Sequence, residues 1–265
     1  MDLTTEAGDG TRLRYQVDGP AGAPVLLLIN AIGCTRDLWA RTAPGLAAHY
    51  RVVRYDARGH GASAVPPGEY TLEQLGRDAV AVLDAVGAAT AHVCGISLGG
   101  LTAMWMGVHA PERVTRLVLA NTAARIGSVE SWTERMALVR NEGMSAVADR
   151  AMLTWFTSEY RERDAETVRG FRAMLQGCPP AGYLGCCAAL RDADLRDTVP
   201  STRCPVLVIG ARHDVSTTVA QAEFLRDHIA KAELIVLDSA HLSNVERSDD
   251  FAAAVRGFLG YPSTP

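Results

Sequence analysis

Short, uninterrupted apolar runs alternate along this chain with longer segments of helical length and periodicity, and this rhythm restricts the fold more than any other feature. Apolar character without alternation marks strands that are covered on both faces, as in parallel sheets. The strand-like runs are residues 25–29, 51–55, 91–94, 114–120, 206–209 and 233–237. Helical segments lie between them, at residues 37–49, 72–86, 98–109, 219–229 and 245–259. The sequence therefore predicts an α/β fold with a mostly parallel, doubly wound sheet.

Two stretches depart from this rhythm. Near the N-terminus, Leu3, Leu13 and Tyr15 surround a glycine-containing turn at residues 8–10, which predicts an antiparallel hairpin at the edge of the sheet. Further along, several helical windows follow one another with no strand run among them, at residues 128–141, 144–156, 165–175 and 183–190. We therefore expect a sheet core formed by residues 1–122 and 200–265, with a helical cap inserted at residues 123–199. The sequence leaves open whether the cap closes over a site or only adds a helical layer.

The composition narrows the classes of protein to which the chain can belong. At 265 residues, of which 48% are hydrophobic and 21% charged, it is long enough for one compact unit with an inserted subdomain. The net charge of −4, without a basic cluster, argues against nucleic acid as a partner. No N-terminal signal pattern and no apolar run of about 18 residues are present, so we expect no membrane association and a cytoplasmic location. A homo-oligomer remains open.

The six cysteines are scattered along the chain. They form no Cys-x-x-Cys pair and have no cluster of histidines beside them, which are the patterns typical of zinc and redox sites. We interpret them as small buried hydrophobic residues. The sequence thus predicts no metal and no cofactor.

A strand, a sharp turn and a helix meet at residues 95–100, which read Gly-Ile-Ser-Leu-Gly-Gly. Such a turn forces strained backbone angles on Ser97, while Gly95 and Gly99 let neighbouring backbone pass close to it. The strand-like run 91–94 and the helical segment 98–109 supply the context that this motif needs. We therefore predict that Ser97 is a nucleophile whose hydroxyl projects from the edge of the sheet.

A serine hydroxyl needs a base that takes its proton as it attacks. Among the seven histidines, His241 lies in the loop between the last strand-like run and the last helix, and Asp214 follows the run 206–209. The order serine, acid, histidine is the one expected for this kind of elbow. We predict His241 as the base and Asp214 as the carboxylate that orients its imidazole. The alternative position for the acid, after the run 114–120, holds Asn121.

Attack on an acyl carbon creates an oxyanion, which backbone N–H groups can stabilise without rearrangement. We predict the N–H groups of Leu98 and Ile32 as the two donors, the second from the loop after the first strand-like run. Asn30 opens the same loop, and we weigh a contact with the substrate against a hydrogen bond within the loop. The charged, glycine-rich turn at residues 55–63 lacks the ending of a phosphate-binding loop, so we interpret it as structural.

Several of these segments together resemble the 3-oxoadipate enol-lactonases, which have the α/β-hydrolase fold. The resemblance spans nearly the whole chain and is carried by residues 30–33, 55–61, 94–100, 155–157, 185–195 and the run Ala-His-Leu-Ser-Asn-Val-Glu at 240–246. It implies a serine hydrolase that opens the enol-lactone of the β-ketoadipate branch of aromatic catabolism. The product would be 3-oxoadipate, formed through an acyl-enzyme on Ser97 and without a cofactor.

The resemblance also implies an anionic small-molecule substrate, which a local cation should bind because the protein as a whole is negative. We expect Arg191, in the cap, to be this counter-ion and Trp155 to form a wall of the pocket. The alternatives are an ion pair of Arg191 with Asp192 or Asp194 at the cap surface, and ordinary core packing for Trp155.

The loop at residues 30–34 departs from the family pattern Asn-Ser-Leu-Gly-Thr, because it carries Ala31, Ile32 and Cys34. This keeps open a carboxylesterase or lactonase that acts on another small ester with the same three catalytic residues. A further alternative, from a different class, is a non-catalytic ligand-binding protein on the hydrolase scaffold.

Overall fold

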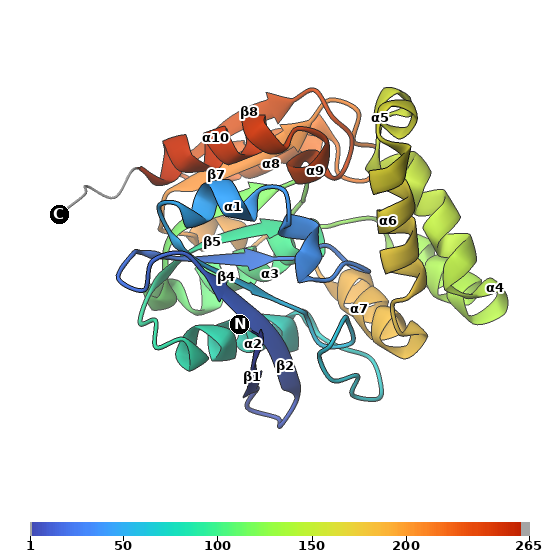
Figure 1. Ribbon diagram of the computed structural model, residues 1–265, viewed down its shortest axis with the longest axis horizontal. Coiled ribbons are helices and arrows are strands. Elements are labelled where there is room, and N and C mark those ends of the chain that lie inside the picture. The colour runs from blue at the N-terminus through green and yellow to red at the C-terminus, as the bar shows by residue number, and fades with distance from the viewer. Residues whose placement is uncertain (1, 261–265) are drawn as a thin grey trace.

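The computed structural model describes residues 2–260, and a sheet of eight strands forms its centre (Figure 1). The strands are β1 (Asp2–Glu6), β2 (Arg12–Asp18), β3 (Val25–Ile29), β4 (Arg51–Tyr55), β5 (Ala91–Ile96), β6 (Val114–Ala120), β7 (Val206–Ala211) and β8 (Ala232–Leu237). Their order is β1-β2-β4-β3-β5-β6-β7-β8. β2 is antiparallel to both of its neighbours, and all other pairs are parallel. The predicted α/β fold, with its mostly parallel sheet and edge hairpin, is confirmed.

The inner strands are buried because helices cover both faces of the sheet. In β3, Leu26, Leu27 and Leu28 are fully buried, and every residue of β7 is buried. β8 lies at the edge of the sheet and is only partly covered, with Val236 36% exposed. Continuous apolar runs therefore identify the strands, while the position in the sheet decides how deeply each one is buried.

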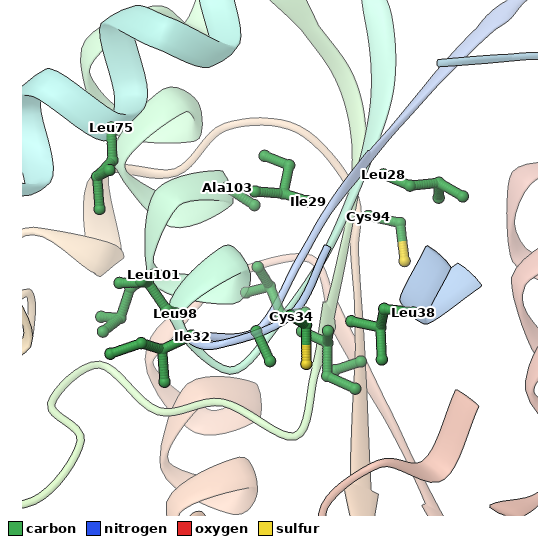
Figure 2. Close-up of a cluster of buried hydrophobic side chains, with 14 of the residues drawn as sticks. Leu28, Ile29, Ile32, Cys34, Leu38, Leu75, Cys94, Leu98, Leu101 and Ala103 are labelled. Atoms are coloured by element: carbon green, nitrogen blue, oxygen red, sulfur yellow. The ribbon is translucent and has the colours of Figure 1, made fainter. Parts of the chain in front are cut away.

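Helices flank the sheet on both faces (Figure 1). They are α1 (Ala43–Ala47), α2 (Leu72–Ala85), α3 (Leu98–His109), α8 (Val219–His228), α9 (Ser243–Glu246) and α10 (Ser248–Leu259). α1 packs beside α10, and α2 packs beside α3 on the opposite face. Figure 2 shows part of the resulting core, with Ala103 of α3 beside Ile29 of β3.

Two predicted helices are each divided in the structure. The segment 37–49 forms a 3₁₀ turn, η1 (Arg36–Trp39), followed by the separate helix α1. Pro44 prevents a continuous helix here, because it has no N–H and its ring would collide with the carbonyl group of Ala40. The segment 245–259 is likewise divided into α9 and α10 by Arg247, whose φ of −129° is not helical.

Between β6 and β7, a segment that the structure describes throughout, the chain forms only helices and short turns. The helices are α4 (Val129–Trp155), α5 (Ser158–Arg163), α6 (Ala165–Gln176) and α7 (Pro180–Asp192). α4 joins the two predicted windows across a bend at Gly143, which has a φ of 77°. α5 has no counterpart among the predicted segments. We call residues 123–199 the cap; its helices gather beyond one end of the sheet (Figure 1).

α7 is fastened to the core by direct contact between two backbones. A Cβ atom on Gly182, in α7, would lie 2.1 Å from the carbonyl oxygen of Gly59, and a Cβ atom on Gly59 would lie 2.5 Å from the Cα atom of Gly182. Both positions therefore require glycine. Nearby, the N–H of Tyr70 donates to the carbonyl oxygen of Gly185 at 3.1 Å. This end of the cap is held in a fixed relation to the turn at residues 55–63.

Candidate active site

Ser97 lies at the sharp turn between β5 and α3, as the sequence predicts. Its backbone angles, φ 58° and ψ −118°, are ones that residues other than glycine rarely adopt. Two hydrogen bonds hold the turn: Ser97 N–H donates to the carbonyl oxygen of Ala120 at 3.1 Å, and the Thr122 hydroxyl donates to the carbonyl oxygen of Ser97 at 2.8 Å. Strain of this kind persists only where the surrounding structure enforces it, and it concentrates at functional sites.

Two glycines allow the turn to form. A Cβ atom on Gly95 would lie 2.0 Å from the carbonyl oxygen of Gly99, and a Cβ atom on Gly99 would lie 2.2 Å from the carbonyl oxygen of Ile29. Neither position accepts a side chain unless backbone moves. The close approach of these three segments places the start of α3 directly against the loop that follows β3.

Asp214 follows β7 and is a buried carboxylate with five donors. Its Oδ1 accepts from the N–H groups of Ser216 at 2.8 Å and Thr217 at 2.9 Å. Its Oδ2 accepts from the Thr217 hydroxyl at 2.7 Å, from Asn121 Nδ2 at 3.0 Å and from His241 Nδ1 at 2.8 Å. Burial alone would raise the pKa of Asp214, but the His241 imidazole and the Thr217 donors hold it well below its usual value. Asp214 is therefore ionised at neutral pH.

His241 lies in the loop between β8 and α9, and it is 3% exposed. Because Asp214 accepts from Nδ1, the imidazole is fixed in the tautomer that leaves Nε2 free to accept a proton. His241 and Ser97 line the same cavity. The structure thus brings together, at the carboxyl ends of three strands, the three side chains that the sequence singles out.

Asn121, at the end of β6, supports this arrangement in a way that the sequence analysis missed. It has a φ of 42°, and its N–H donates to the carbonyl oxygen of Ile209 at 2.8 Å. Its Nδ2 donates to Asp214, and its Oδ1 accepts from the hydroxyl of Ser243 at 2.5 Å. The side chain therefore bridges the acid and the helix that follows the histidine loop. The only signal in the sequence was its position, where a carboxylate was the alternative considered.

The residues of the two predicted oxyanion donors are neighbours, and Figure 2 shows the side chain of Ile32 beside that of Leu98. Leu98 is the first residue of α3, so its N–H has no carbonyl partner within the helix. Ile32 lines the same cavity as Ser97. The N–H of the next residue, Gly33, already donates to His60 Nε2 at 2.8 Å, which removes Gly33 from the candidates.

Asn30 is turned away from this cavity, whose lining does not include it. Its Nδ2 donates to the carbonyl oxygen of Tyr55 at 2.8 Å, and its Oδ1 accepts from Trp39 Nε1 at 2.9 Å. Both ends of the amide are thus used inside the core. The predicted contact with substrate is corrected to the alternative, a hydrogen-bonded support for the loop.

The turn at residues 55–63 is also a support rather than a binding site. Arg58 is buried and donates to both oxygens of Asp78 at 2.6 Å. Burial lowers the pKa of His60, so the ring is neutral. Its Nδ1 faces the carbonyl oxygen of Arg58 at 3.1 Å, which leaves Nε2 to accept from Gly33. The turn therefore holds the loop that carries Ile32.

A cavity of about 260 Å³ lies over Ser97, between core and cap. Trp155 lines it from the end of α4, in the position of the predicted pocket wall. Arg135, also on α4, lines it as well and donates to the Tyr183 hydroxyl at 3.4 Å. Among the side chains that the structure describes, Arg135 forms no ion pair. The sequence analysis did not single it out.

Arg191 is placed elsewhere. It donates to both oxygens of Glu69, at 3.1 and 2.9 Å, and to both oxygens of Asp192, each at 2.8 Å. These two carboxylates hold it at the surface, and it does not line the cavity over Ser97. The prediction of Arg191 as a counter-ion is corrected to the alternative of a surface ion pair. The partner Glu69 lies 122 residues away in the sequence, which hid it from a local reading.

Within residues 2–260, no group of three or more histidine, cysteine, aspartate or glutamate side chains is arranged to hold a metal ion. The cysteines are free, and burial raises the pKa of Cys187 to about 12, so that it is a protonated thiol at neutral pH. Over the same part of the chain, no helix combines the length and the apolar character needed to cross a membrane.

Comparison with known proteins agrees with this geometry. The profile of the alpha/beta hydrolase fold family matches residues 24–248. The chain is 40% identical over 247 residues to 3-oxoadipate enol-lactonase 2 of Acinetobacter baylyi, covering 93% of this chain and 92% of the relative. The enol-lactonase from Burkholderia xenovorans superposes with a TM-score of 0.95 at 40% identity, over 97% of this chain and 99% of that structure. A hydrolase from Pseudomonas aeruginosa gives a TM-score of 0.95 at 45% identity, with 98% of each chain covered. The chain therefore belongs to the α/β-hydrolase fold family, within the group of ester hydrolases that includes the 3-oxoadipate enol-lactonases.

Proposed function

We propose that this chain opens 3-oxoadipate enol-lactone to 3-oxoadipate through an acyl-enzyme on Ser97. The observation that carries the proposal is the buried pair of His241 and Asp214, whose imidazole lines the cavity over the strained serine. The enol-lactonases of Acinetobacter baylyi and Burkholderia xenovorans support the choice of substrate, because this chain covers both almost from end to end.

In the first half of the reaction, Ser97 Oγ attacks the lactone carbonyl carbon while His241 Nε2 takes its proton. The charge that develops on the carbonyl oxygen is stabilised by the N–H groups of Leu98 and Ile32. When the tetrahedral intermediate collapses, the C–O bond of the ring breaks and His241 returns the proton to the enol oxygen. The enol stays attached to the acyl group because both belong to the opened ring.

In the second half, water attacks the ester carbonyl carbon while His241 Nε2 takes one of its protons. The bond to Ser97 Oγ then breaks, and His241 gives that proton to the serine. The product leaves as a carboxylate, and its enol ketonises to 3-oxoadipate. Asp214 stabilises the imidazolium that forms in each half without accepting a proton itself. Only proton transfers and water are required.

Arg135 replaces Arg191 as the proposed counter-ion for the substrate carboxylate. It lines the cavity, and among the described residues its one hydrogen-bond partner is the neutral hydroxyl of Tyr183. Burial raises the pKa of Tyr183, so this hydroxyl does not compete with a carboxylate for the guanidinium. A guanidinium and a carboxylate form charge-assisted hydrogen bonds that are stronger than neutral ones. Trp155 forms the apolar wall of the same cavity.

A comparison of substrates tests the proposal. Wild type should turn over the enol-lactone with a far higher kcat/KM than p-nitrophenyl acetate, and a fluorophosphonate probe should label Ser97. A preference for the aryl ester would instead support a general carboxylesterase. Absence of labelling in the folded protein would support a ligand-binding role on the hydrolase scaffold.

A further inference from the structure

The histidine loop and the cap meet at one buried carboxylate, Glu246, the last residue of α9. Its Oε2 accepts from the N–H of Ala240 at 3.1 Å and from the N–H of Thr157 at 3.3 Å. Its Oε1 accepts from the hydroxyl of Thr157. Ala240 is the residue before His241, and Thr157 lies between α4 and α5. One side chain thus joins the loop of the catalytic base to the cap.

A second link lies on the other side of the histidine. The N–H of Leu242 donates to the carbonyl oxygen of Trp155 at 3.0 Å. The residues before and after His241 are therefore both tied to cap residues 155–157. Trp155, which lines the cavity over Ser97, belongs to that short cap segment.

The position of Glu246 calls for acceptor oxygens rather than for bulk. It is 8% exposed, and among the described side chains it forms no ion pair. All three of its donors are neutral groups. If the carboxylate were removed, the buried N–H of Ala240 would be left unpaired in the interior, and the half-buried Thr157 would lose the acceptors of its N–H and its hydroxyl. Burying a carboxylate is costly unless such donors satisfy it, so packing alone does not account for one here.

The rest of α4 is held differently. The helix bends at Gly143, where a Cβ atom would meet no atom within 4 Å. Trp155 lies after this bend, and Arg135 lies before it. The links to the histidine loop therefore fix the half of α4 that carries the tryptophan, and they do not act directly on the half that carries the arginine.

We propose that Glu246 is a positioning residue that holds His241 and the Trp155 wall of the pocket in one fixed relation. The inference rests on the proposed function, in which His241 moves the proton of Ser97. Asp214 fixes the imidazole from the side of the core, and Glu246 fixes the backbone of the same loop from the side of the cap. Substrate that rests against Trp155 is thereby placed relative to the base.

The test measures turnover per working site. A fluorophosphonate probe measures the fraction of protein molecules whose Ser97 is labelled, and the rate of p-nitrophenyl acetate hydrolysis is divided by that fraction to give kcat per labelled site. The proteins compared are wild type, Glu246→Ala, Glu246→Gln and the control Glu159→Ala. Glu246→Ala should lose kcat by about 10- to 100-fold, the size expected when a catalytic group is slightly misplaced. Glu246→Gln should stay near wild type, because its carbonyl oxygen can still accept from both N–H groups. The control removes an exposed cap carboxylate and should change nothing.

Thr157 provides an independent arm that keeps the glutamate. Thr157→Val replaces the hydroxyl, which also accepts from the N–H of Tyr160 at the start of α5, with a methyl group, and it should lower kcat less than Glu246→Ala does. Thr157→Ser keeps the hydroxyl and should retain wild-type kcat. The double variant Glu246→Ala/Thr157→Val should be no slower than Glu246→Ala alone, because both changes break the same link. A purely structural role would lower Tm and the number of labelled sites while leaving kcat per site unchanged.

Wild-type kcat per labelled site in both Glu246→Ala and Thr157→Val would overturn the proposal, whatever their Tm. A loss in Glu246→Gln as large as in Glu246→Ala would also overturn it, since charge rather than hydrogen bonding would then be responsible. These results are distinct from a failure of the proposed function. That failure would show in the wild-type protein, as an unlabelled Ser97 or as no turnover of the enol-lactone.

Discussion

The proposed catalytic half of the site and its proposed binding half are held in place by different means. Ser97, Asp214 and His241 stand on turns at the ends of β5, β7 and β8, where strand register and close backbone contacts leave little freedom. The wall of the cavity comes largely from α4, a helix that bends at Gly143. The serine and the acid are fixed by the sheet itself, whereas the histidine loop also contacts the cap, and α4 is placed by its packing against α6 and α7.

This difference indicates how the two halves can change independently. Changes in the catalytic half should reduce turnover of every substrate, because they remove a group that acts on the ester bond itself. Changes to the cap residues that line the cavity should alter which substrate is preferred. The decrease in turnover should therefore be largest, and the same for every substrate, when the changed residue follows a strand of the sheet.

The largest decrease in kcat is expected when the proposed nucleophile or the proposed base is removed. Ser97→Ala and His241→Ala should each lower kcat by about 10⁴- to 10⁶-fold, and the double variant should be no slower than either one, because the two groups act as a unit. The measurement is kcat for both the enol-lactone and p-nitrophenyl acetate. Near wild-type turnover by Ser97→Ala on either substrate would refute the mechanism.

The next largest loss is expected for the acid. Asp214→Asn should lower kcat by about 10³- to 10⁴-fold, because an amide that donates to Nδ1 holds the imidazole in the wrong tautomer. Both substrates should be affected equally. A loss confined to the enol-lactone would show that Asp214 contributes to binding instead.

The same carboxylate should also affect stability in a pH-dependent way. Folding lowers the pKa of Asp214 below its ordinary value of 3.8. The carboxylate therefore contributes fully to stability above pH 3.8, and this contribution is lost as the pH falls through the lowered pKa. The difference in free energy of unfolding between wild type and Asp214→Asn should be constant from neutral pH to about pH 5 and shrink below about pH 4. Urea unfolding at several pH values measures it. A difference that grows on acidification would contradict the assignment.

A smaller loss, dependent on substrate, is expected in the cap. Arg135→Ala should lower kcat/KM for the enol-lactone by about 10- to 100-fold, the value of one charge-assisted hydrogen bond, and should leave p-nitrophenyl acetate nearly unaffected because it has no carboxylate. Arg191→Ala, which removes a surface cation, is the matched control. Equal losses on both substrates would break the division between the two halves.

The smallest effect is expected at Asn121, which supports Asp214 without lining the cavity. It should be a loss of stability rather than of turnover. Asn121→Gly should destabilise the protein by about 1–3 kcal/mol, since it leaves Asp214 and Ser243 each without one partner. Asn121→Ala should cost about 1 kcal/mol more, because alanine disfavours the positive φ. Unfolding free energies of the two variants separate the lost hydrogen bonds from backbone strain. Equal stability of the two would mean that φ at this position relaxes.

The sequence predicts those parts of the molecule that depend on neighbours along the chain. Continuous apolar runs locate the strands, and the glycines around Ser97 indicate the turn, because both signals act over a few residues. The break before Pro44 could have been predicted from the proline itself. The edge position of β8 could not, because it depends on the order of strands in the folded sheet.

The roles of residues in and beside the cap could not be predicted from the sequence. Arg191 lies in one of the segments that resemble the enol-lactonases, yet its partner Glu69 is distant in the sequence and holds it at the surface. Arg135 lies on a helix with several exposed charges, and only the packing of α4 against α7 shows that it faces the cavity. Glu246 likewise gains its role from Thr157, which the fold brings beside it.

The pair Gly59 and Gly182 has a consequence for protein engineering. Two main chains touch there with no side chain between them. A cap taken from another protein and grafted onto this scaffold must therefore also have glycine at that contact. The graft must also keep the contacts of residues 155–157 with the histidine loop. Chimeras that preserve these contacts should assemble, and the range of esters that they accept should follow the donor of the cap.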